Sequence, residues 1–357
     1  MRQLIVLAPN WLGDAVMALP AIDDVRRLTG ARVIVAARRS VAPLFALVPG
    51  VDDIVELQWR GRAGDPRGMV GDIRRLRSLR GDVALLLPNS FASAWLAFAA
   101  GTPQRWGYAT DGRTFLLTRA VEKPRHADEA ATGDGGISRH QGTYYQHLVR
   151  ELGASNGPLE PRVVVPERAR AEARALLETW GWQTAQPLVV FAPGAAYGTA
   201  KRWWPTHFAQ LAADLVQQHG AHVTLVGSAA DAEATRAVSA AVPDWARASV
   251  SDLAGRTSLE RLAAVLSLAR ACVSNDSGAM HLAAAVGVPL TAVFGPTNEH
   301  ETSPLAHAPV DLLIHPVPCR PCMLRECPID HPCMRDLAPA VVLSSVKRML
   351  EIHEVVR

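Results

Sequence analysis

The chain has 357 residues, of which 49% are hydrophobic and 20% charged, and its formal net charge is +3. This is an ordinary globular composition, and the length predicts two domains with a core each. No run approaches the roughly 20 apolar residues of a membrane span, and the small net charge gives no indication of nucleic-acid binding. The first residues are apolar but interrupted, without a basic leader or a small-residue cleavage site, so we expect a cytoplasmic protein.

Short apolar runs alternate with helical segments along the whole chain, which is typical of a parallel sheet with helices on both faces. In the first half we expect strands at Gln3–Ala8, Arg32–Ala37, Asp53–Leu57, Asp82–Leu87 and Arg105–Tyr108, and helices at Ala15–Leu28, Asp72–Leu79, Ser90–Ala100 and His140–Leu152. In the second half we expect strands at Leu188–Ala192, His222–Val226, Ala271–Ser274 and Leu290–Phe294, and helices at Thr206–His219, Asp231–Ala241, Ser258–Ala269, Ala279–Val286 and about Pro339–Ile352. The pattern predicts two successive Rossmann-like halves that face a cleft.

The connections between these elements carry weaker signals. Ala127–Ser138 has no apolar periodicity and is predicted to be a loop. Ser155–Pro161 begins an interdomain connection, which continues through a short strand at Arg162–Val165 and a helix around Glu167–Trp180. Thr257 and Glu260 have the spacing of a capping box before the helix that follows.

A first group of polar residues, Asn10 to Asp14, follows the first strand. Gly13 permits a tight turn between the strand and the helix, and Asp14 comes at the start of that helix. This is the carboxyl end of the strand, where parallel sheets present ligand-binding residues. Asp14 is either an N-cap stabilised by the helix dipole or a functional carboxylate. The turn is no dinucleotide fingerprint, because it lacks the three glycines of that motif.

A second group, Pro193 to Pro205, follows the first strand of the second half. The loop contains Gly194 and ends in Lys201 and Arg202 just before a helix. Backbone N–H groups and a cation can together neutralise a diphosphate. The alternative is an ordinary loop with two cations at its rim, and the spacing excludes a Walker A loop.

A third group, Val273 to Ala285, gives the strongest signal. A strand ends, Asp276, Ser277 and Gly278 follow, and a helix of small residues begins. The free N–H groups and dipole of a helix start favour an anion. Asp276 and Ser277 could instead only cap the helix, and His281 could be a core histidine. The motif Phe294–Thr297 begins at the end of the next strand, and it can close over a ligand placed there.

Two further clusters remain open to more than one interpretation. Seven arginines lie between Arg60 and Arg80, either as a solvated face or as a patch for an anionic partner. Four of the five cysteines, Cys319, Cys322, Cys327 and Cys333, have a spacing that allows structural zinc, reduced packing thiols or redox cross-links. Cys272 lies in a predicted strand and is expected in the core.

Taken together, the three polar groups resemble the bacterial heptosyltransferases of glycosyltransferase family 9. The resemblance rests on G-D-x-x-x-x-L-P-A-I, P-G-A-x-x-x-x-A-K-R-W and S-N-D-S-G-x-M-H-L-A-A-A, in this order. The opening A-P-N-W-L-G-D, the segment Pro88 to Phe91 and the tail block C-R-P-C-M-L-R-E-C-P are most similar to the type II members, which add the second heptose of the lipopolysaccharide inner core.

The resemblance implies an α/β GT-B fold. It implies an N-terminal acceptor-binding domain at 1–160, a C-terminal nucleotide-sugar-binding domain at 161–338, and a helix at 339–357 that returns to the N-terminal domain. The donor implied is ADP-heptose, transferred with inversion to a heptosyl-Kdo2-lipid A type acceptor at the inner membrane surface. No resident metal or cofactor is implied, and the enzyme is expected in the cytoplasm or peripheral at the inner face of the inner membrane.

The resemblance also implies roles for individual residues. Asp14 matches the general base, and Lys201 matches the cation that stabilises the departing diphosphate. Donor contacts are implied for Gly194, Lys201, Arg202, Asp276, Ser277, Gly278, His281 and Thr297. Acceptor contacts are proposed for Asn10, Trp11, Arg60 and Arg62.

One departure leaves the cation open. The family usually has Lys-x-Trp-Pro, whereas this chain has Lys201-Arg202-Trp203-Trp204-Pro205. Counting back from Pro205 puts Arg202 at the cation position, whereas counting forward from Gly198 puts Lys201 there; we prefer Lys201. The other functions considered are a type I or other family 9 transferase with a different acceptor, a GT-B nucleotide-sugar epimerase, and a nucleotide-binding protein without catalysis.

Overall fold

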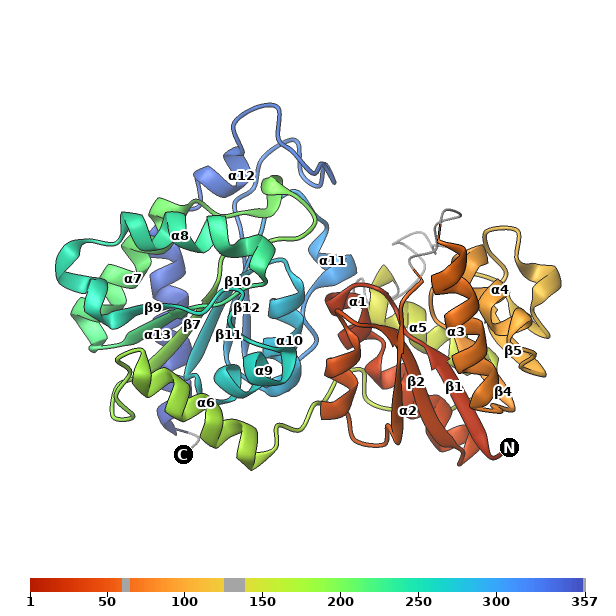
Figure 1. Ribbon diagram of the computed structural model, residues 1–357. Helices are drawn as coiled ribbons and strands as arrows, with labels where there is room; N and C mark the ends of the chain where they lie inside the picture. Colours follow the sequence, from red (N-terminus) through yellow and green to blue (C-terminus); the bar gives the residue numbers. More distant parts are fainter. Residues whose placement is uncertain (60–64, 125–138, 356–357) are drawn as a thin grey trace. The chain divides into compact units, whose positions relative to one another are not determined.

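The computed structural model describes residues 1–59, 65–124 and 139–355 (Figure 1). The chain divides into two compact units, Met1–Val163 and Val164–Arg357. The expected loop at 127–138 and the residues Arg60 and Arg62 lie outside the described residues. Within the described part of the chain, no helix has the length and apolarity needed to cross a membrane.

Unit 1 is a six-stranded parallel sheet in the order β3-β2-β1-β4-β5-β6. Its strands are β1 (Gln3–Leu7), β2 (Arg32–Arg38), β3 (Asp53–Leu57), β4 (Val83–Leu86), β5 (Gln104–Tyr108) and β6 (Arg119–Val121). Its helices are α1 (Leu12–Met17), α2 (Leu19–Thr29), α3 (Pro66–Ser78), α4 (Phe91–Ala99) and α5 (Gln141–Glu151), with 3-10 helices at Ala42–Leu47 (η1) and Thr114–Leu116 (η2). Helices α1, α2 and α5 pack together, and α3 packs with α4, so that two helical layers enclose the sheet.

Unit 2 repeats this arrangement with the order β12-β11-β10-β7-β8-β9, again all parallel. Its strands are β7 (Leu188–Ala192), β8 (His222–Leu225), β9 (Val250–Asp252), β10 (Ala271–Asn275), β11 (Leu290–Phe294) and β12 (Val310–Ile314). Its helices are α6 (Glu167–Thr179), α7 (Pro205–His219), α8 (Ala232–Ala241), α9 (Leu259–Leu268), α10 (Gly278–Val286), α11 (Glu299–Thr302), α12 (Pro332–Arg335) and α13 (Pro339–Val355), and η4 (Thr199–Lys201), η5 (Ala229–Asp231) and η6 (Asp244–Ser249) are 3-10 helices.

The last helix, α13, belongs to the core of unit 2. It packs against α7, β10 and β11, and Val342, Val346 and Met349 are buried among the apolar residues of that core. Figure 1 shows α13 running along one face of the unit 2 sheet. Its expected return to the N-terminal domain stays a prediction.

Several expectations about local structure need correction. The helix expected at Ala15–Leu28 is two helices, α1 and α2, joined at Ala18, because Pro20 in the first turn of α2 has no N–H to donate. Arg162–Val165 forms no strand and has no regular secondary structure between Pro161 and Pro166. The N-cap of α9 is Ser258 rather than Thr257, since the Ser258 hydroxyl accepts the Arg261 N–H at 3.2 Å.

Candidate active site

The strand order of each sheet predicts where ligands bind. In unit 2, β7 and β10 are neighbours, yet the chain leaves β7 toward β8 on one side and β10 toward β11 on the other. In unit 1, β1 and β4 stand in the same relationship. Loops that leave such a pair of strands diverge, and ligands bind at the carboxyl ends there. The second and third polar groups follow β7 and β10, and the first follows β1.

Asn275 fixes the loop after β7 to the end of β10. Its side chain is fully buried; Oδ1 accepts the Trp203 N–H at 3.1 Å, and Nδ2 donates to the Pro193 carbonyl at 2.7 Å. One amide thus holds both ends of the 193–203 loop. Because a buried amide left without partners costs roughly 1–3 kcal/mol, this arrangement strongly favours one loop conformation.

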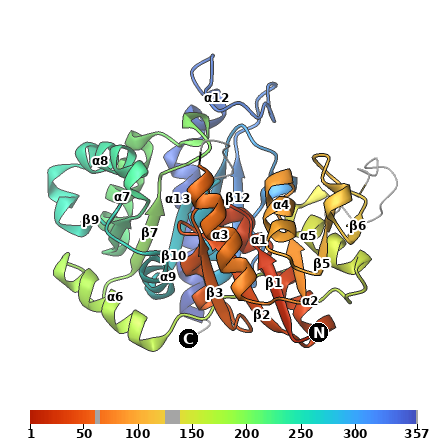
Figure 2. The same ribbon diagram turned by 45° about the vertical axis from the view of Figure 1, so that its right-hand side comes forward.

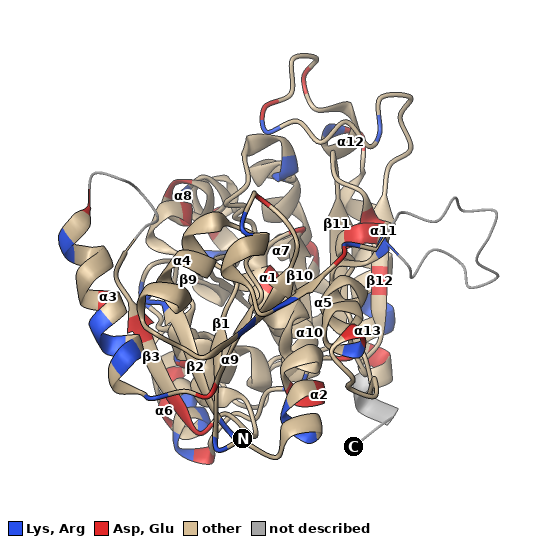
Figure 3. Ribbon diagram, turned by 90° about the vertical axis from the view of Figure 1, so that its right-hand side faces the viewer, with Lys and Arg blue, Asp and Glu red and all other residues tan. Residues whose placement is uncertain are grey.

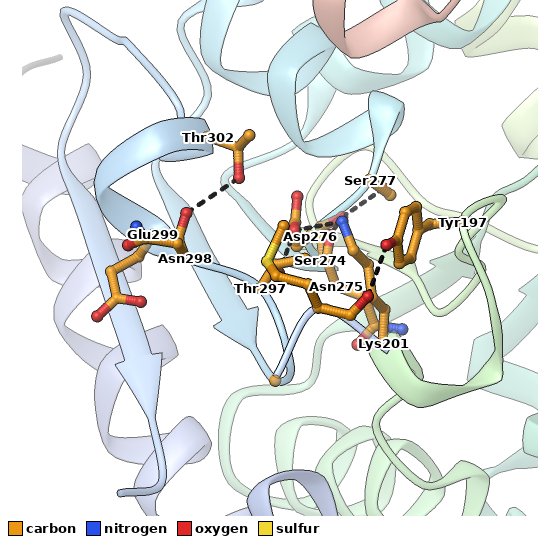
Figure 4. Close-up of polar contacts among 12 residues, drawn as sticks. Tyr197, Lys201, Ser274, Asn275, Asp276, Ser277, Thr297, Asn298, Glu299 and Thr302 are labelled. Atoms are coloured by element: carbon orange, nitrogen blue, oxygen red, sulfur yellow. Dashed lines mark hydrogen bonds and ion pairs between the residues drawn. The ribbon is translucent and has the colours of Figure 1, made fainter. Parts of the chain in front are cut away.

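The same loop delivers Lys201 to the third polar group. Lys201 Nζ lies 2.5 Å from Asp276 Oδ2, and the Thr297 hydroxyl donates to the same oxygen at 2.6 Å (Figure 4). The Lys201 and Asp276 side chains are only 10% and 5% exposed. Nζ also lies 4.8 Å from the centre of the Tyr197 ring, whose face attracts a cation. Lysine, carboxylate and hydroxyl thus form one shielded polar group.

Helix α10 begins immediately beside this group. Ser277 is its N-cap in an extended conformation, Gly278 is its first residue, and the Ser277 side chain caps none of the first-turn N–H groups. The Ser277 hydroxyl instead lies 3.2 Å from that of Ser274. A helix start of this kind carries roughly half a positive charge and favours an anion. His281 lies further along the helix and is buried.

The structure places Lys201, rather than Arg202, against Asp276. Arg202 follows η4 as its C-cap and is partly exposed. Among the described residues its Nε is buried without a hydrogen-bond partner. The two cations are therefore not equivalent in this conformation.

Gly194 has a packing role that does not require a ligand. A Cβ at this position would lie 2.2 Å from Asp231 Oδ1. Asp231 is held there by a capping box, in which its Oδ2 accepts the Ser228 N–H at 2.9 Å and the Ser228 hydroxyl at 2.7 Å. The glycine therefore lets the loop after β7 approach the loop after β8.

Arg320 is a residue of this region that the sequence did not single out. Its guanidinium donates to the Gly295 carbonyl at 2.5 Å, to the Thr297 carbonyl at 3.1 Å and to Glu299 Oε2 at 2.9 Å. It therefore braces the loop that presents the Thr297 hydroxyl. Tyr197 adds a second link between the site and the segment from Cys319 to Cys333, since its hydroxyl donates to the Met323 carbonyl at 2.7 Å. An arginine among cysteines and prolines has no periodic signal that would identify it.

The cysteines do not form the zinc site that their spacing allows. All five are free, and among the described residues no group of three or more His, Cys, Asp or Glu side chains could hold a metal ion. Cys319 is exposed, whereas Cys333 packs into the core of unit 2. Burial raises the pKa of Cys333, and the thiols of Cys319, Cys322 and Cys327 raise it further. Cys327 Sγ accepts the His331 N–H at 3.2 Å.

In unit 1, Asp14 is not the N-cap of its helix. Trp11 occupies that position with extended backbone, and Asp14 lies in the first turn of α1, where its charge suits the dipole. The Asp14 side chain is partly buried. Burial of Tyr145 raises the pKa of Tyr145, and the negative charge of Asp14 raises it further. Asn10 and Trp11 are exposed.

Arg113 organises the other loops at this edge of the unit 1 sheet, and no sequence motif points to this role. It is fully buried and donates to the carbonyls of Pro88 at 2.5 Å and Tyr108 at 3.1 Å, and to the Ser93 hydroxyl at 2.8 Å. Burial lowers the pKa of Arg113 to about 10. The loops after β4 and β5 are thus tied to one cation.

Known proteins share this sequence and architecture. The profile of glycosyltransferase family 9 (heptosyltransferase) matches residues 72–332. Lipopolysaccharide heptosyltransferase 2 of Salmonella typhimurium and that of Escherichia coli are each 33% identical to the chain over 317 residues, which cover 85% of this chain and 86% of theirs. The solved E. coli ADP-heptose lps heptosyltransferase II has a TM-score of 0.82 at 28% identity, over 99% of this chain and 100% of that one. The predicted GT-B fold is confirmed, and the chain belongs to glycosyltransferase family 9, the heptosyltransferases.

Proposed function

We propose that this glycosyltransferase moves L-glycero-D-manno-heptose from ADP-heptose to the inner-core heptose of lipopolysaccharide, with inversion at the anomeric carbon. The observation that carries the proposal is the shielded group of Lys201, Asp276 and Thr297 beside the start of α10. A buried cation next to uncapped N–H groups has the charge that a nucleoside diphosphate requires. The names of the relatives from Salmonella typhimurium and Escherichia coli support heptose and lipopolysaccharide as the sugar and the acceptor.

In this proposal unit 2 binds the donor. The diphosphate lies against the first turn of α10, where Gly278 offers no side chain to obstruct it. Ser277, His281, Gly194 and Arg202 complete the proposed donor contacts. Lys201 stabilises the negative charge that develops on the departing ADP, and an electrostatic contribution of this kind is often the largest in catalysis. The chain's own groups then supply what a metal ion would otherwise provide.

Asp14 is proposed as the general base. Inversion requires a single displacement, so one carboxylate suffices to take the proton of the attacking acceptor hydroxyl as the new glycosidic bond forms and the bond to ADP breaks. A positioned base contributes typically about 10²–10⁴-fold in rate. Its place in the first turn of α1, after β1, matches the position at which such sheets present reactive groups.

We further propose that residues 1–160 bind the acceptor, that 161–338 bind the donor, and that 339–357 return to the N-terminal domain. Asn10, Trp11, Arg60 and Arg62 are the proposed acceptor contacts, because an inner-core acceptor carries carboxylates and phosphates that arginine binds well. We expect the enzyme to work in the cytoplasm, at the inner face of the inner membrane.

A transfer assay tests the proposal. The purified chain is incubated with ADP-heptose and either heptosyl-Kdo2-lipid A or Kdo2-lipid A, and the products are measured by mass spectrometry. We expect addition of one heptose to the heptosylated acceptor and release of ADP. Transfer only to the acceptor without heptose would make the enzyme a type I transferase. Conversion of the donor in the absence of any acceptor would instead indicate an epimerase.

A further inference from the structure

Helix α4 of unit 1 presents large aromatic side chains to solvent. Phe91, Trp95 and Phe98 are 39%, 36% and 46% exposed, and they lie at positions i, i+4 and i+7, which share one helix face. Phe115 of η2 is 76% exposed and extends this surface, since its ring centre is 6.2 Å from that of Phe91. The Trp95 and Phe98 rings are 5.9 Å apart. These four rings, Phe91, Trp95, Phe98 and Phe115, are called the aromatic face below.

The opposite side of α4 already supplies the core. Ala94 and Ala97 are buried in the apolar cluster that α4 and α3 form with the sheet. A helix on the surface of a soluble protein normally buries its large apolar residues and exposes polar ones. Here Ala94, Leu96 and Ala97 face inward and the four rings face outward, so the core does not explain the aromatic face. An exposed apolar patch of this kind marks an interaction surface.

Helix α3 lies beside α4 and carries exposed arginines (Figure 2). Arg67, Arg74 and Arg77 are exposed on α3 and are called the basic stripe, and no ion pair is found for these three among the described residues. Figure 3 shows blue bands of basic residues along α3. Arg77 reaches across to α4, where its guanidinium donates to the Ala99 carbonyl at 2.8 Å. Arg105 lies over the Phe98 ring at 5.4 Å. Arg77 and Arg105 therefore bring positive charge to the edge of the aromatic face.

We propose that the aromatic face of α4 and η2, together with the basic stripe of α3, docks this enzyme on an anionic lipid bilayer. Aromatic rings partition into the interfacial layer of a membrane, and arginines near an anionic surface are attracted to it. The aromatic face and the basic stripe are both needed, because stable peripheral binding takes an apolar and an electrostatic contribution together. None of the residues of this surface is among those proposed for transfer.

A second copy of the chain fits this surface less well. In a two-fold dimer the same patch meets itself. The arginines of the two basic stripes would then approach one another, and like charges brought together at an interface oppose association. The electrostatics therefore favour a negatively charged surface over a self-complementary contact.

The experiment measures co-sedimentation of the full chain with vesicles. One set contains phosphatidylethanolamine and phosphatidylglycerol, and the other contains phosphatidylcholine alone. We expect binding to the anionic vesicles that weakens with salt, and a loss of about tenfold or more for Trp95→Ser combined with Phe98→Ser. Phe115→Ser provides a second, more exposed position. Trp245→Ser, at a 59% exposed tryptophan in η6 of unit 2, is the matched control and should bind as the unaltered chain does.

The basic stripe is tested in the same way. Arg74→Glu with Arg77→Glu should abolish the preference for anionic vesicles. Arg236→Glu is the control, because Arg236 is also exposed and also donates to a backbone carbonyl, that of Ala232. Circular dichroism and thermal melting confirm that each variant is folded.

Three results would overturn the proposal. The first is that the unaltered chain does not bind anionic vesicles. The second is that the Trp95 and Phe98 variants bind these vesicles as tightly as the unaltered chain. Alternatively, sedimentation equilibrium would show that the chain is a dimer which these variants dissociate, making the aromatic face a contact between copies. Transfer to a soluble, lipid-free acceptor is measured in parallel and should be unchanged in the aromatic-face variants, so failure of docking is distinguished from failure of the proposed function.

Discussion

Lys201 Nζ and Asp276 Oδ2 lie 2.5 Å apart, although 75 positions separate the two residues in the chain. The contact exists because β7 and β10 are adjacent parallel strands and both residues follow the carboxyl ends of those strands. The Thr297 hydroxyl, presented after β11, donates to the same carboxylate oxygen. Three neighbouring strands thus contribute one side chain each to a polar group from which most water is excluded.

The first prediction concerns this pair. Lys201→Ala should weaken ADP binding by about 10-fold or more, because a charge-assisted hydrogen bond contributes roughly 1.5–3 kcal/mol. It should also lower the free energy of unfolding by roughly 3 kcal/mol, since a buried carboxylate loses its cation. Calorimetry with ADP and urea unfolding measure the two effects. Arg202→Ala is the matched control and should do less in both.

The double variant Lys201→Ala with Asp276→Ala separates stability from binding. Removing both charges should restore much of the lost stability, because no unpaired buried charge is left. It should not restore the affinity for ADP. A larger loss of ADP binding in Arg202→Ala than in Lys201→Ala would mean that Arg202 is the cation of the donor site.

The second prediction concerns the proposed base. Asp14→Asn should reduce transfer by about 10²-fold or more, because an amide cannot take the acceptor proton. The side chain keeps its size in the first turn of α1, so the melting temperature and ADP affinity should change little. Single-turnover transfer, thermal melting and calorimetry are the measurements. Near-normal turnover would show that Asp14 serves only the stability of α1.

The third prediction concerns the start of α10. Gly278→Ala should keep or raise the melting temperature, because alanine is the better helix former. The added methyl group should obstruct a diphosphate at the first turn, so the affinity for ADP should fall. The two quantities are measured by thermal melting and calorimetry on the same sample. A variant that loses stability but keeps its ADP affinity would refute the phosphate site at this turn.

The fourth prediction is a pH dependence of stability. His222 of β8 is fully buried, its Nε2 lies 3.1 Å from the Ser251 hydroxyl, and burial lowers the pKa of His222 to about 4. The unfolded chain has the ordinary value near 6.5 and takes up the proton first as the pH falls. Stability should therefore be unaffected by this group above pH 6.5 and should fall between about pH 6.5 and 4, by on the order of 3 kcal/mol.

His222→Gln should remove that part of the pH dependence. Urea unfolding between pH 4 and 8 measures the free energy of unfolding of both proteins. The two curves should converge toward low pH as the unaltered chain loses the contribution of a neutral histidine. Parallel curves over the whole range would show that His222 is not the group responsible.

Much of the fold could be predicted because its central strands are fully buried. The run of β7 is apolar throughout and those of β1 and β11 contain one polar residue each, so the positions of these strands follow from composition alone. The edge strands β6, β9 and β12 were not predicted, because they are short or only partly buried and their sequences show no clear pattern. The division of the first helix at Ala18 follows from Pro20. This local signal lies within an apolar run that reads as one continuous helix.

The sequence by itself determined the order of strands and helices, the family, and the three polar groups that follow β1, β7 and β10. These are local signals, carried by residues close together in the chain. The tertiary structure decided which of them meet: that Lys201, rather than Arg202, contacts Asp276, and that Arg320 braces the loop of Thr297. It also decided that Trp95 and its neighbours face solvent and that the four clustered cysteines are not gathered into a metal site with any other residues that the structure describes. Such facts depend on the pairing of strands and the packing of helices across long stretches of chain, which no local pattern encodes.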